Sequence, residues 1–351
     1  MKRIFLLLSV GLSLSMSAKS PYLSKVYDFV PAPGQFINEM PECEEGDTKT
    51  DIISKVEEQI CGDKNPGMIS LGAWGGYVVF GFDHPVVNVK GEYDFKIYGN
   101  AFIANGATGK GSCEPGIVMV SYDDNGNGKP DDKWYELAGS EYNKSTTIHD
   151  YKLTYYRTPS DHVADPDPNN ASIIDRTYIK WVDNKNETGY VMQNSFHRQS
   201  YWPSWIDEET ITFEGCRLAD NGADESGKGT YYTLKMLDYG YVDNQPNDSD
   251  PGFKIDWAVD ETGASVYLPA ISFIKVYNAI NQYCGWIGET STEVCGGEDL
   301  HPDAELSGVE NVIFDENAPV EYYNLQGIKV ENPQNGIYIK RQGSKTMKVV
   351  L

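Results

Sequence analysis

Basic residues are scarce in this sequence relative to acidic ones. The chain of 351 residues carries 29 Lys and Arg against 52 Asp and Glu, and its formal net charge is -23. Such a surface repels phosphate backbones, which proteins bind through clusters of Lys and Arg. The composition therefore argues against a nucleic-acid partner. An excess of carboxylates also suits a calcium-rich exterior, where divalent ions relieve the self-repulsion of the protein.

Several motifs of catalysis and metal binding are missing as well. The five histidines form no H-E-x-x-H pair, no C-x-x-C occurs, and there is neither a G-x-S-x-G elbow nor a phosphate-binding glycine loop. These absences remove the sequence marks of a zinc hydrolase, a zinc ribbon, a thioredoxin-like site and a serine hydrolase. With so many carboxylates, a glycoside hydrolase that uses an acid–base pair stays open as an alternative.

Long hydrophobic runs are limited to the N-terminus. The basic start "MKR" is followed by "IFLLLSVGLSLSM" and then by the small residues of "SAKS". This order is typical of a secretory signal peptide, for which we predict residues 1–18 with cleavage after Ala18. The run is too short for a membrane span, which needs about 20 residues. We therefore expect an exported protein at the cell surface, outside the cell or in the periplasm, without a transmembrane span.

The six cysteines form an even set in a chain that we expect to be exported. Such a set favours disulfides, although six cysteines allow 15 pairings. Short spacing in the sequence makes Cys43–Cys61 and Cys284–Cys295 the simplest pairs, which leaves Cys113–Cys216.

Helical periodicity is also scarce, and an all-β fold is predicted. Apolar residues recur at helical spacing only in "TKTDIISKVEEQICG", residues 48–62, which we expect to be one short amphipathic helix. Most other segments are short, β-branched and aromatic, with turn residues between them. They predict an antiparallel β-sandwich with long loop insertions at 157–172 and 220–229. The expected strands are 76–82, 93–99, 116–122, 133–139, 150–156, 175–183, 210–218, 232–242, 253–259 and 271–280.

The chain is expected to have a main domain and a small C-terminal one. We place the sandwich at 19–303, a linker at 304–318 and a small β unit at 319–351. The last segment contains three apparent strands and is too short for a stable core of its own.

An acidic stretch, "SYDDNGNGKPDDKWYEL", is the main candidate for a metal site. Its oxygen-bearing residues recur at alternate positions around a glycine, as in a calcium loop, and the side chains or carbonyls expected to bind are those of Asp123, Asn125, Asn127, Lys129, Asp131 and Asp132. Trp134 stands where an EF-hand would have a bidentate Glu, and the flanks are strands. The alternative is a hairpin with a type I′ turn at Asn127-Gly128. Both interpretations can hold together, and we predict a structural Ca²⁺.

Aromatic residues cluster in "FHRQSYWPSWIDEE". Tyr201, Trp202 and Trp205 surround Pro203, with Arg198 nearby. Flat rings on a rigid loop can stack on a sugar or another planar ligand. The alternative is that these rings cap the sandwich core. A ligand-binding surface requires at least two rings open to solvent.

Two resemblances concern the main domain. The run "GIVMVSYDDNGNGKPDDKWYELAGS" and the segment "VYLPAISFIKVYNAI" resemble strands of galactose-binding-like (discoidin-type) sandwiches, which implies a jelly-roll with ligand loops at one end. The motifs "ISLGAWGGYVVFGFDHPVVN", "YDFKIYGNAF", "EPGIVMVSYD", "IDWAVD" and "NQYCGWIGETSTEV" are similar to a Bacteroidetes group described as cell surface proteins, over residues 25–303. Some members of such groups lie beside genes for corrinoid (vitamin B12) uptake, which implies capture of a corrinoid or another nutrient.

The tail resembles the C-terminal sorting domain of the Bacteroidetes Por secretion system. Tyr323, Leu325, Gly327, Gly336, Tyr338, Ile339 and Lys348 match its pattern. This resemblance implies an uptake or secretion partner at the outer membrane.

Together these features predict an exported, calcium-stabilised surface protein that binds a glycan or small nutrient without turnover. The alternatives are a corrinoid-capture accessory protein, a secreted glycoside hydrolase and a structural or adhesion protein.

Overall fold

The computed structural model describes residues 19–306, 319–324, 327–331, 333–334, 336–342 and 345–350. The chain divides between Ala304 and Glu305 into two units. The predicted signal peptide, most of the predicted linker and Leu325 of the predicted sorting domain lie outside the described residues. Strands make up 37% and helices 6% of the structure, and every paired strand is antiparallel. The prediction of an all-β sandwich-type fold is confirmed.

The main sheet of the first unit has six strands, which run from edge to edge as β1 (Lys25–Val30), β3 (Tyr77–Gly81), β18 (Phe273–Asn278), β8 (Gly116–Ser121), β9 (Trp134–Leu137) and β16 (Ala258–Val259). Successive side chains of a strand point to opposite faces of its sheet. In β8, Val118 and Val120 lie in one hydrophobic cluster, whereas Ile117 lies in another. The sheet is therefore covered on both faces.

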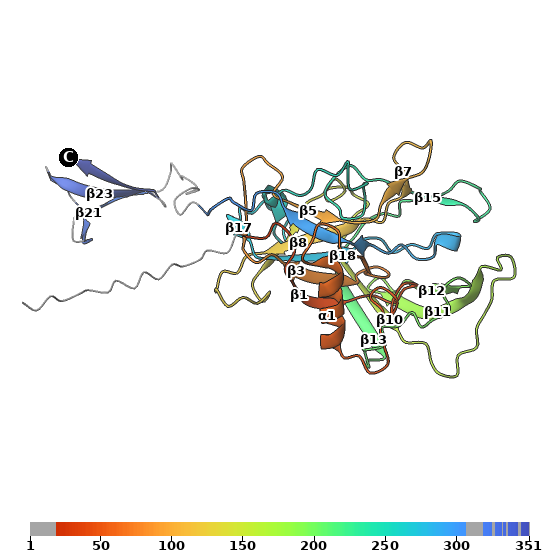
Figure 1. The fold of residues 1–351 in the computed structure, drawn as a ribbon. Coiled ribbons are helices and arrows are strands. Elements are labelled where there is room, and N and C mark those ends of the chain that lie inside the picture. Colours follow the sequence, from red (N-terminus) through yellow and green to blue (C-terminus); the bar gives the residue numbers. More distant parts are fainter. Residues whose placement is uncertain are drawn as a thin grey trace, which may run out of the picture. The chain divides into compact units, whose positions relative to one another are not determined.

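One face of the main sheet is covered by α1 (Lys49–Ile60), the one α-helix among the described residues (Figure 1). The helix begins with a capping box, in which Thr48 and Asp51 each satisfy a backbone N–H of the other. Ile52, Val56 and Ile60 are buried in the main core. The helix predicted at 48–62 is thus confirmed.

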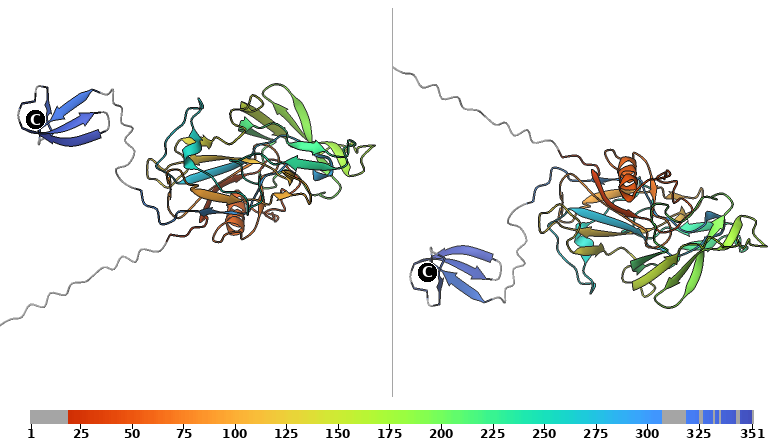
Figure 2. Two further views of the ribbon diagram at one scale, coloured as in Figure 1. Left: turned by 90° about the horizontal axis from the view of Figure 1, so that it is seen from above. Right: turned by 90° about the horizontal axis from the view of Figure 1, so that it is seen from below.

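The other face is covered by a sheet of four strands in the order β12 (Thr188–Asn194), β11 (Ile173–Asp183), β10 (Ile148–Tyr156) and β13 (Thr210–Arg217). Tyr77 of the main sheet contacts Phe213 of β13 edge to face, with ring centroids 6.3 Å apart. The hydroxyl of Tyr277 accepts a hydrogen bond from the Cys216 N–H. Figure 2 shows this sheet, in green, on the side of the main sheet away from α1.

Short strands form the rest of the first unit. A third sheet has the order β14 (Gly222–Asp224), β15 (Tyr232–Lys235), β7 (Lys110–Ser112) and β6 (Phe102–Ile103). Three two-stranded pairs are β17 (Ala270–Ile271) with β4 (Val86–Val87), β19 (Glu293–Val294) with β2 (Ile69–Ser70), and β20 (Gly296–Asp299) with β5 (Phe95–Tyr98). Two 3₁₀ turns are η1 (Ile255–Trp257) and η2 (Gly285–Ile287).

The second unit contains one antiparallel sheet, in the order β22 (Lys329–Val330), β21 (Val320–Tyr323), β23 (Ile337–Gln342) and β24 (Lys345–Val350). Its three longer strands coincide with the three that the sequence suggests. No helix among the described residues is long and apolar enough to cross a membrane.

The prediction of three disulfides is wrong, because all six cysteines are free thiols. Cys113 and Cys284 belong to one buried cluster, whereas Cys216 belongs to another. The members of the predicted Cys113–Cys216 pair therefore lie in different clusters, whereas Cys43 and Cys61 both pack against the main core without a bond between them.

Thiol titration is expected to confirm this state. Protein unfolded without reductant should show six reactive thiols, and folded protein only slow reaction at the half-buried Cys43 and Cys61. Burial raises the pKa of Cys61 and of Cys113 to about 12, which leaves little reactive thiolate at neutral pH. Fewer than six thiols in the unfolded chain would show that disulfides form after all.

Candidate functional site

The acidic stretch of 121–137 is a hairpin between β8 and β9, with Ser121 opposite Trp134. Its turn is not the predicted type I′ turn, which needs positive φ at both Asn127 and Gly128. Positive φ occurs instead at Gly126 and Gly128, within a longer loop.

The loop is held by its own side chains. Asp123 accepts hydrogen bonds from the N–H groups of Asn127 and Gly128, at 3.0 and 2.9 Å. The amide groups of Asn125 and Asn127 donate to Asp131, and these bonds lower the pKa of that carboxyl. The donor set suits calcium, since it offers carboxylate and amide oxygens from Asp123, Asn125, Asn127, Asp131 and Asp132 with the Lys129 carbonyl.

The predicted ligand-binding surface requires at least two aromatic rings that are open to solvent. The rings of Tyr201 and Trp202 do not meet this requirement. These side chains are 0% and 4% exposed and belong to the core between the two large sheets. Trp205 is half-buried and stacks on Phe29 in the other core. Arg198 is exposed. The rings anchor a loop, because each large apolar surface gains more from burial than from exposure.

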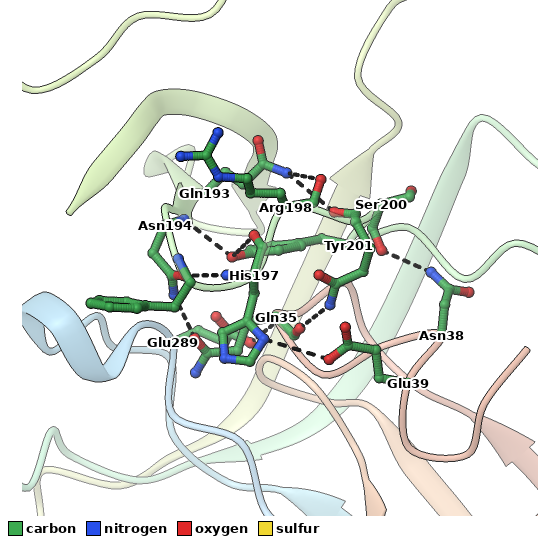
Figure 3. A network of polar contacts seen from close by, with 12 residues as sticks. Gln35, Asn38, Glu39, Gln193, Asn194, His197, Arg198, Ser200, Tyr201 and Glu289 are labelled. Carbon is green, nitrogen blue, oxygen red and sulfur yellow. Dashed lines mark hydrogen bonds and ion pairs between the residues drawn. The ribbon is translucent and has the colours of Figure 1, made fainter. Parts of the chain in front are cut away.

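Figure 3 shows the polar contacts that hold this loop. The Asn194 side chain donates to Gln35 Oε1 at 2.6 Å, and its own oxygen accepts from the N–H groups of Phe196 and His197. Asn38 donates to the carbonyl of Ser200 at 2.8 Å. The contacts fix segment 194–202 against segment 34–40 and so build one wall of a large cavity.

The cavity has a volume of about 550 Å³. This size lies within the range of small-molecule sites, roughly 300–1,000 Å³. Its walls come from the 34–40 and 194–202 segments, from β6, β7 and β15, and from η2. Aromatic and thioether side chains dominate these walls, and they belong to Phe36, Met40, Met68, Phe102, Phe196, Tyr231 and Tyr232. Phe102 and Phe196 are 59% and 67% exposed, so their rings are available to a ligand.

Two buried carboxyl groups, Glu114 and Glu293, reach the same cavity. Each has one oxygen within 4.8 Å of the other and of the buried Asp243. Glu114 lies two residues before the start of β8, Glu293 lies in β19, and Asp243 follows Val242, which bridges to Gly116. The backbone pairing of three distant segments thus assembles this acidic triad.

Hydrogen bonds hold the triad in place. Asp243 accepts from the N–H groups of Asn100 and Glu293, at 2.7 and 3.0 Å. Ser291 donates its N–H to Glu114 and its hydroxyl to Glu293. A side chain at Gly99 would lie within 2.7 Å of Asp243, so only glycine leaves room for this carboxyl.

Burial governs the charge of the triad. It raises the pKa of Glu114 to about 7, and burial with the nearby Glu114 charge raises the pKa of Asp243 and Glu293 well above the usual range. Like charges so close together cannot all be ionised unless a cation lies among them. The triad can therefore donate hydrogen bonds as neutral carboxyls, or hold a hard cation as carboxylates.

Sequence inspection missed this site. Glu114, Asp243 and Glu293 stand far apart in the chain and share no spacing motif. An available signal was weak: Phe196 stands among polar residues in "QNSFHRQS", where an apolar ring has no obvious core to join.

A comparison with protein-family models finds no match for the chain, and a comparison with curated proteins finds none either. The function is therefore inferred from the geometry and chemistry of the cavity and the acidic triad.

Proposed function

We propose that this protein binds a small ligand, a glycan or another nutrient, in the cavity above the acidic triad and does not transform it. The supporting observation is the combination of exposed aromatic rings with two buried carboxyls in one cavity of about 550 Å³. The apolar face of a sugar or a similar ring packs on Phe102 and Phe196. Its hydroxyl groups exchange hydrogen bonds with Glu114 and Glu293 at the bottom of the cavity.

Binding is favoured over glycoside hydrolysis by the charge state of the carboxyls. A hydrolase pairs a protonated carboxyl with a second, ionised carboxylate that acts as base or nucleophile. Here three carboxyls converge, with one oxygen of each within 4.8 Å of the others. Burial raises the pKa of all three, so none has the lowered pKa that would keep a base or nucleophile ionised. A purely structural or adhesive protein would need no such cavity.

A binding screen tests the proposal. Glycan arrays, small nutrients and corrinoids are compared by calorimetry, and any hit is incubated with the protein and analysed for products. We expect saturable binding of one class and an unchanged ligand. Release of reducing sugar that disappears in Glu114→Gln would instead establish the hydrolase alternative.

Export and calcium stabilisation are part of the same proposal. Export is supported by the sequence of residues 1–18 and by the resemblance of the tail to a sorting domain. Calcium is supported by the donor set of the 123–132 loop.

Calcium is expected to raise the melting temperature by several degrees, since a ligand that binds only the folded state stabilises it. Asp123→Asn should abolish the gain, because Asp123 contributes the two inward oxygens of the loop. Asp161→Asn, an exposed carboxylate of another loop, is the matched control. The measurement is thermal unfolding with calcium or with chelator. An equal gain in Asp123→Asn and wild type would remove this loop as the site.

A further inference from the structure

A second, smaller cavity lies between the four-stranded sheet and the segment that follows β18. Its volume is about 80 Å³, and it is separate from the large cavity described above. Trp181 of β11 and Tyr190 of β12 contribute to one side. Segment 280–283, Glu289 and Thr290 contribute to the other, and the buried ring of Trp74 is also part of the wall.

Two polar atoms in this cavity have no partner. Glu289 is 3% exposed, and its Oε2 is buried without a hydrogen bond, as is the hydroxyl of Tyr283. The other carboxyl oxygen, Oε1, accepts from the Gln35 N–H, so Glu289 is held in place while Oε2 stays unpaired. A buried polar atom without a partner costs about 1–3 kcal/mol, and more when it carries a charge. This cost points to a missing hydrogen-bond donor.

The backbone explains why both atoms meet in one place. Tyr283 and Glu289 face each other in an antiparallel bridge across the turn that contains η2. Directly opposed residues of such a pair project to the same side. The carboxyl and the phenol are therefore presented together.

Aromatic rings surround these two acceptors. Trp181 can lie over β12 because Gly189 stands opposite it, and a Cβ at Gly189 would be 2.4 Å from the indole. Trp74 is fully buried, whereas Tyr190 alternates with Gly189 and Val191 and projects from the other face of the sheet, where it is 38% exposed. The face of a Trp ring attracts cations, and the attraction grows when water is excluded.

We propose that this cavity binds a protonated primary amine, the alkylammonium group of a small molecule or of a side chain. Its N–H donors satisfy Glu289 Oε2 and the Tyr283 hydroxyl, and its first methylene groups pack on Trp181 and Trp74. Without a ligand, burial raises the pKa of Glu289 to about 8, so binding of the ammonium ionises this carboxyl and releases one proton. A hard divalent cation is a poor match, because it requires about six oxygen ligands and the cavity offers one carboxylate.

Ethylammonium chloride is the probe for this site. Ligand-observed NMR and calorimetry on the full chain compare it with ethanol, which has the same shape but no charge, and with potassium chloride. Saturable binding of ethylammonium alone is expected. Equal binding of ethanol would show that only apolar packing is involved, and no binding of either would show that water satisfies these atoms. Both results would overturn the proposal.

Variants assign the binding to the cavity. Glu289→Gln should weaken ethylammonium binding by about tenfold or more, because hydrogen bonds to a charged partner are the strong ones. Tyr283→Phe removes one acceptor and should weaken it by a smaller factor. Glu187→Gln removes an exposed carboxylate from the β11–β12 turn and is the charge-matched control. If Glu289→Gln does not fold, unchanged binding in Tyr283→Phe contradicts the assignment. The two cavities share no lining residue, so a failure to find a ligand for the large cavity would not change the ethylammonium binding expected here.

Discussion

The free energy of unfolding is expected to fall by roughly 3 kcal/mol or more as the pH rises from about 5 to about 9. Buried carboxyls are the reason. Burial raises the pKa of Glu114 to about 7 and that of Glu289 to about 8, and it raises those of Asp243 and Glu293 well above the usual range. In the unfolded chain these groups titrate near 4.5 for Glu and 3.8 for Asp.

The direction of the effect follows from proton binding. A carboxyl with a raised pKa in the folded state stays neutral there while its unfolded counterpart is already ionised. Its stabilising effect is complete below the unfolded pKa and is lost as the pH rises through the folded pKa. The carboxyls with lowered pKa, such as Asp47, Asp51 and Asp131, act oppositely. Their contribution changes below their unfolded pKa of 3.8, outside this pH window.

Urea unfolding at a series of pH values measures this effect, with a chelator present so that no cation replaces the protons of the triad. Glu293→Gln keeps the shape of the side chain but cannot ionise, so its stability should depend less on pH than that of the wild type. Glu187→Gln, an exposed control, should keep the wild-type slope. Stability that rises across this range would contradict the assignment of raised pKa values to the buried carboxyls.

Local patterns in the sequence predicted the elements that depend on local physics. The helix α1 follows from the spacing of Ile52, Val56 and Ile60 and from the capping box of Thr48 and Asp51. The strands of the two large sheets follow from β-branched and aromatic runs between turn residues. Segment 253–259 was predicted as a strand and instead contains η1 and only two strand residues, Ala258 and Val259. Its apolar residues pack in the core without continuous ladder pairing.

The candidate site could not be predicted in this way, because it is made by contacts between distant segments. Glu114 and Asp243 meet because Gly116 bridges to Val242 across the fold. Conversely, Tyr201 and Trp202 are adjacent in sequence and suggested a surface, but Asn38 and Asn194 hold their loop so that both rings face the core. Sequence proximity is a poor guide to exposure when a loop is anchored by aromatic residues. The acidic hairpin could be recognised in the sequence because its oxygen-bearing residues are all local.

A tryptophan in place of Ala104 is expected to abolish ligand binding in the large cavity, with a loss of affinity of at least about tenfold. Ala104 is half-buried on the cavity wall in the β6–β7 turn, and its N–H donates to the Lys110 carbonyl. The backbone there is fixed, so a new indole extends into the cavity and occupies the space beside Phe102. Removing the Phe196 ring should weaken binding by a smaller factor, since it deletes one contact and leaves the space open.

The matched control for this substitution is Ala107→Trp, three residues along the same turn. Ala107 is also half-buried, and its N–H donates to the carbonyl of Ala104, but its side chain is not part of the cavity wall. Calorimetry with the ligand found in the screen, and fluorescence of the neutral dye Nile red as a second probe, compare the two variants, while thermal unfolding checks that both fold. Binding should be lost only in Ala104→Trp. Wild-type affinity in a folded Ala104→Trp would place the ligand elsewhere on the protein, because an indole and a ligand cannot fill the same volume.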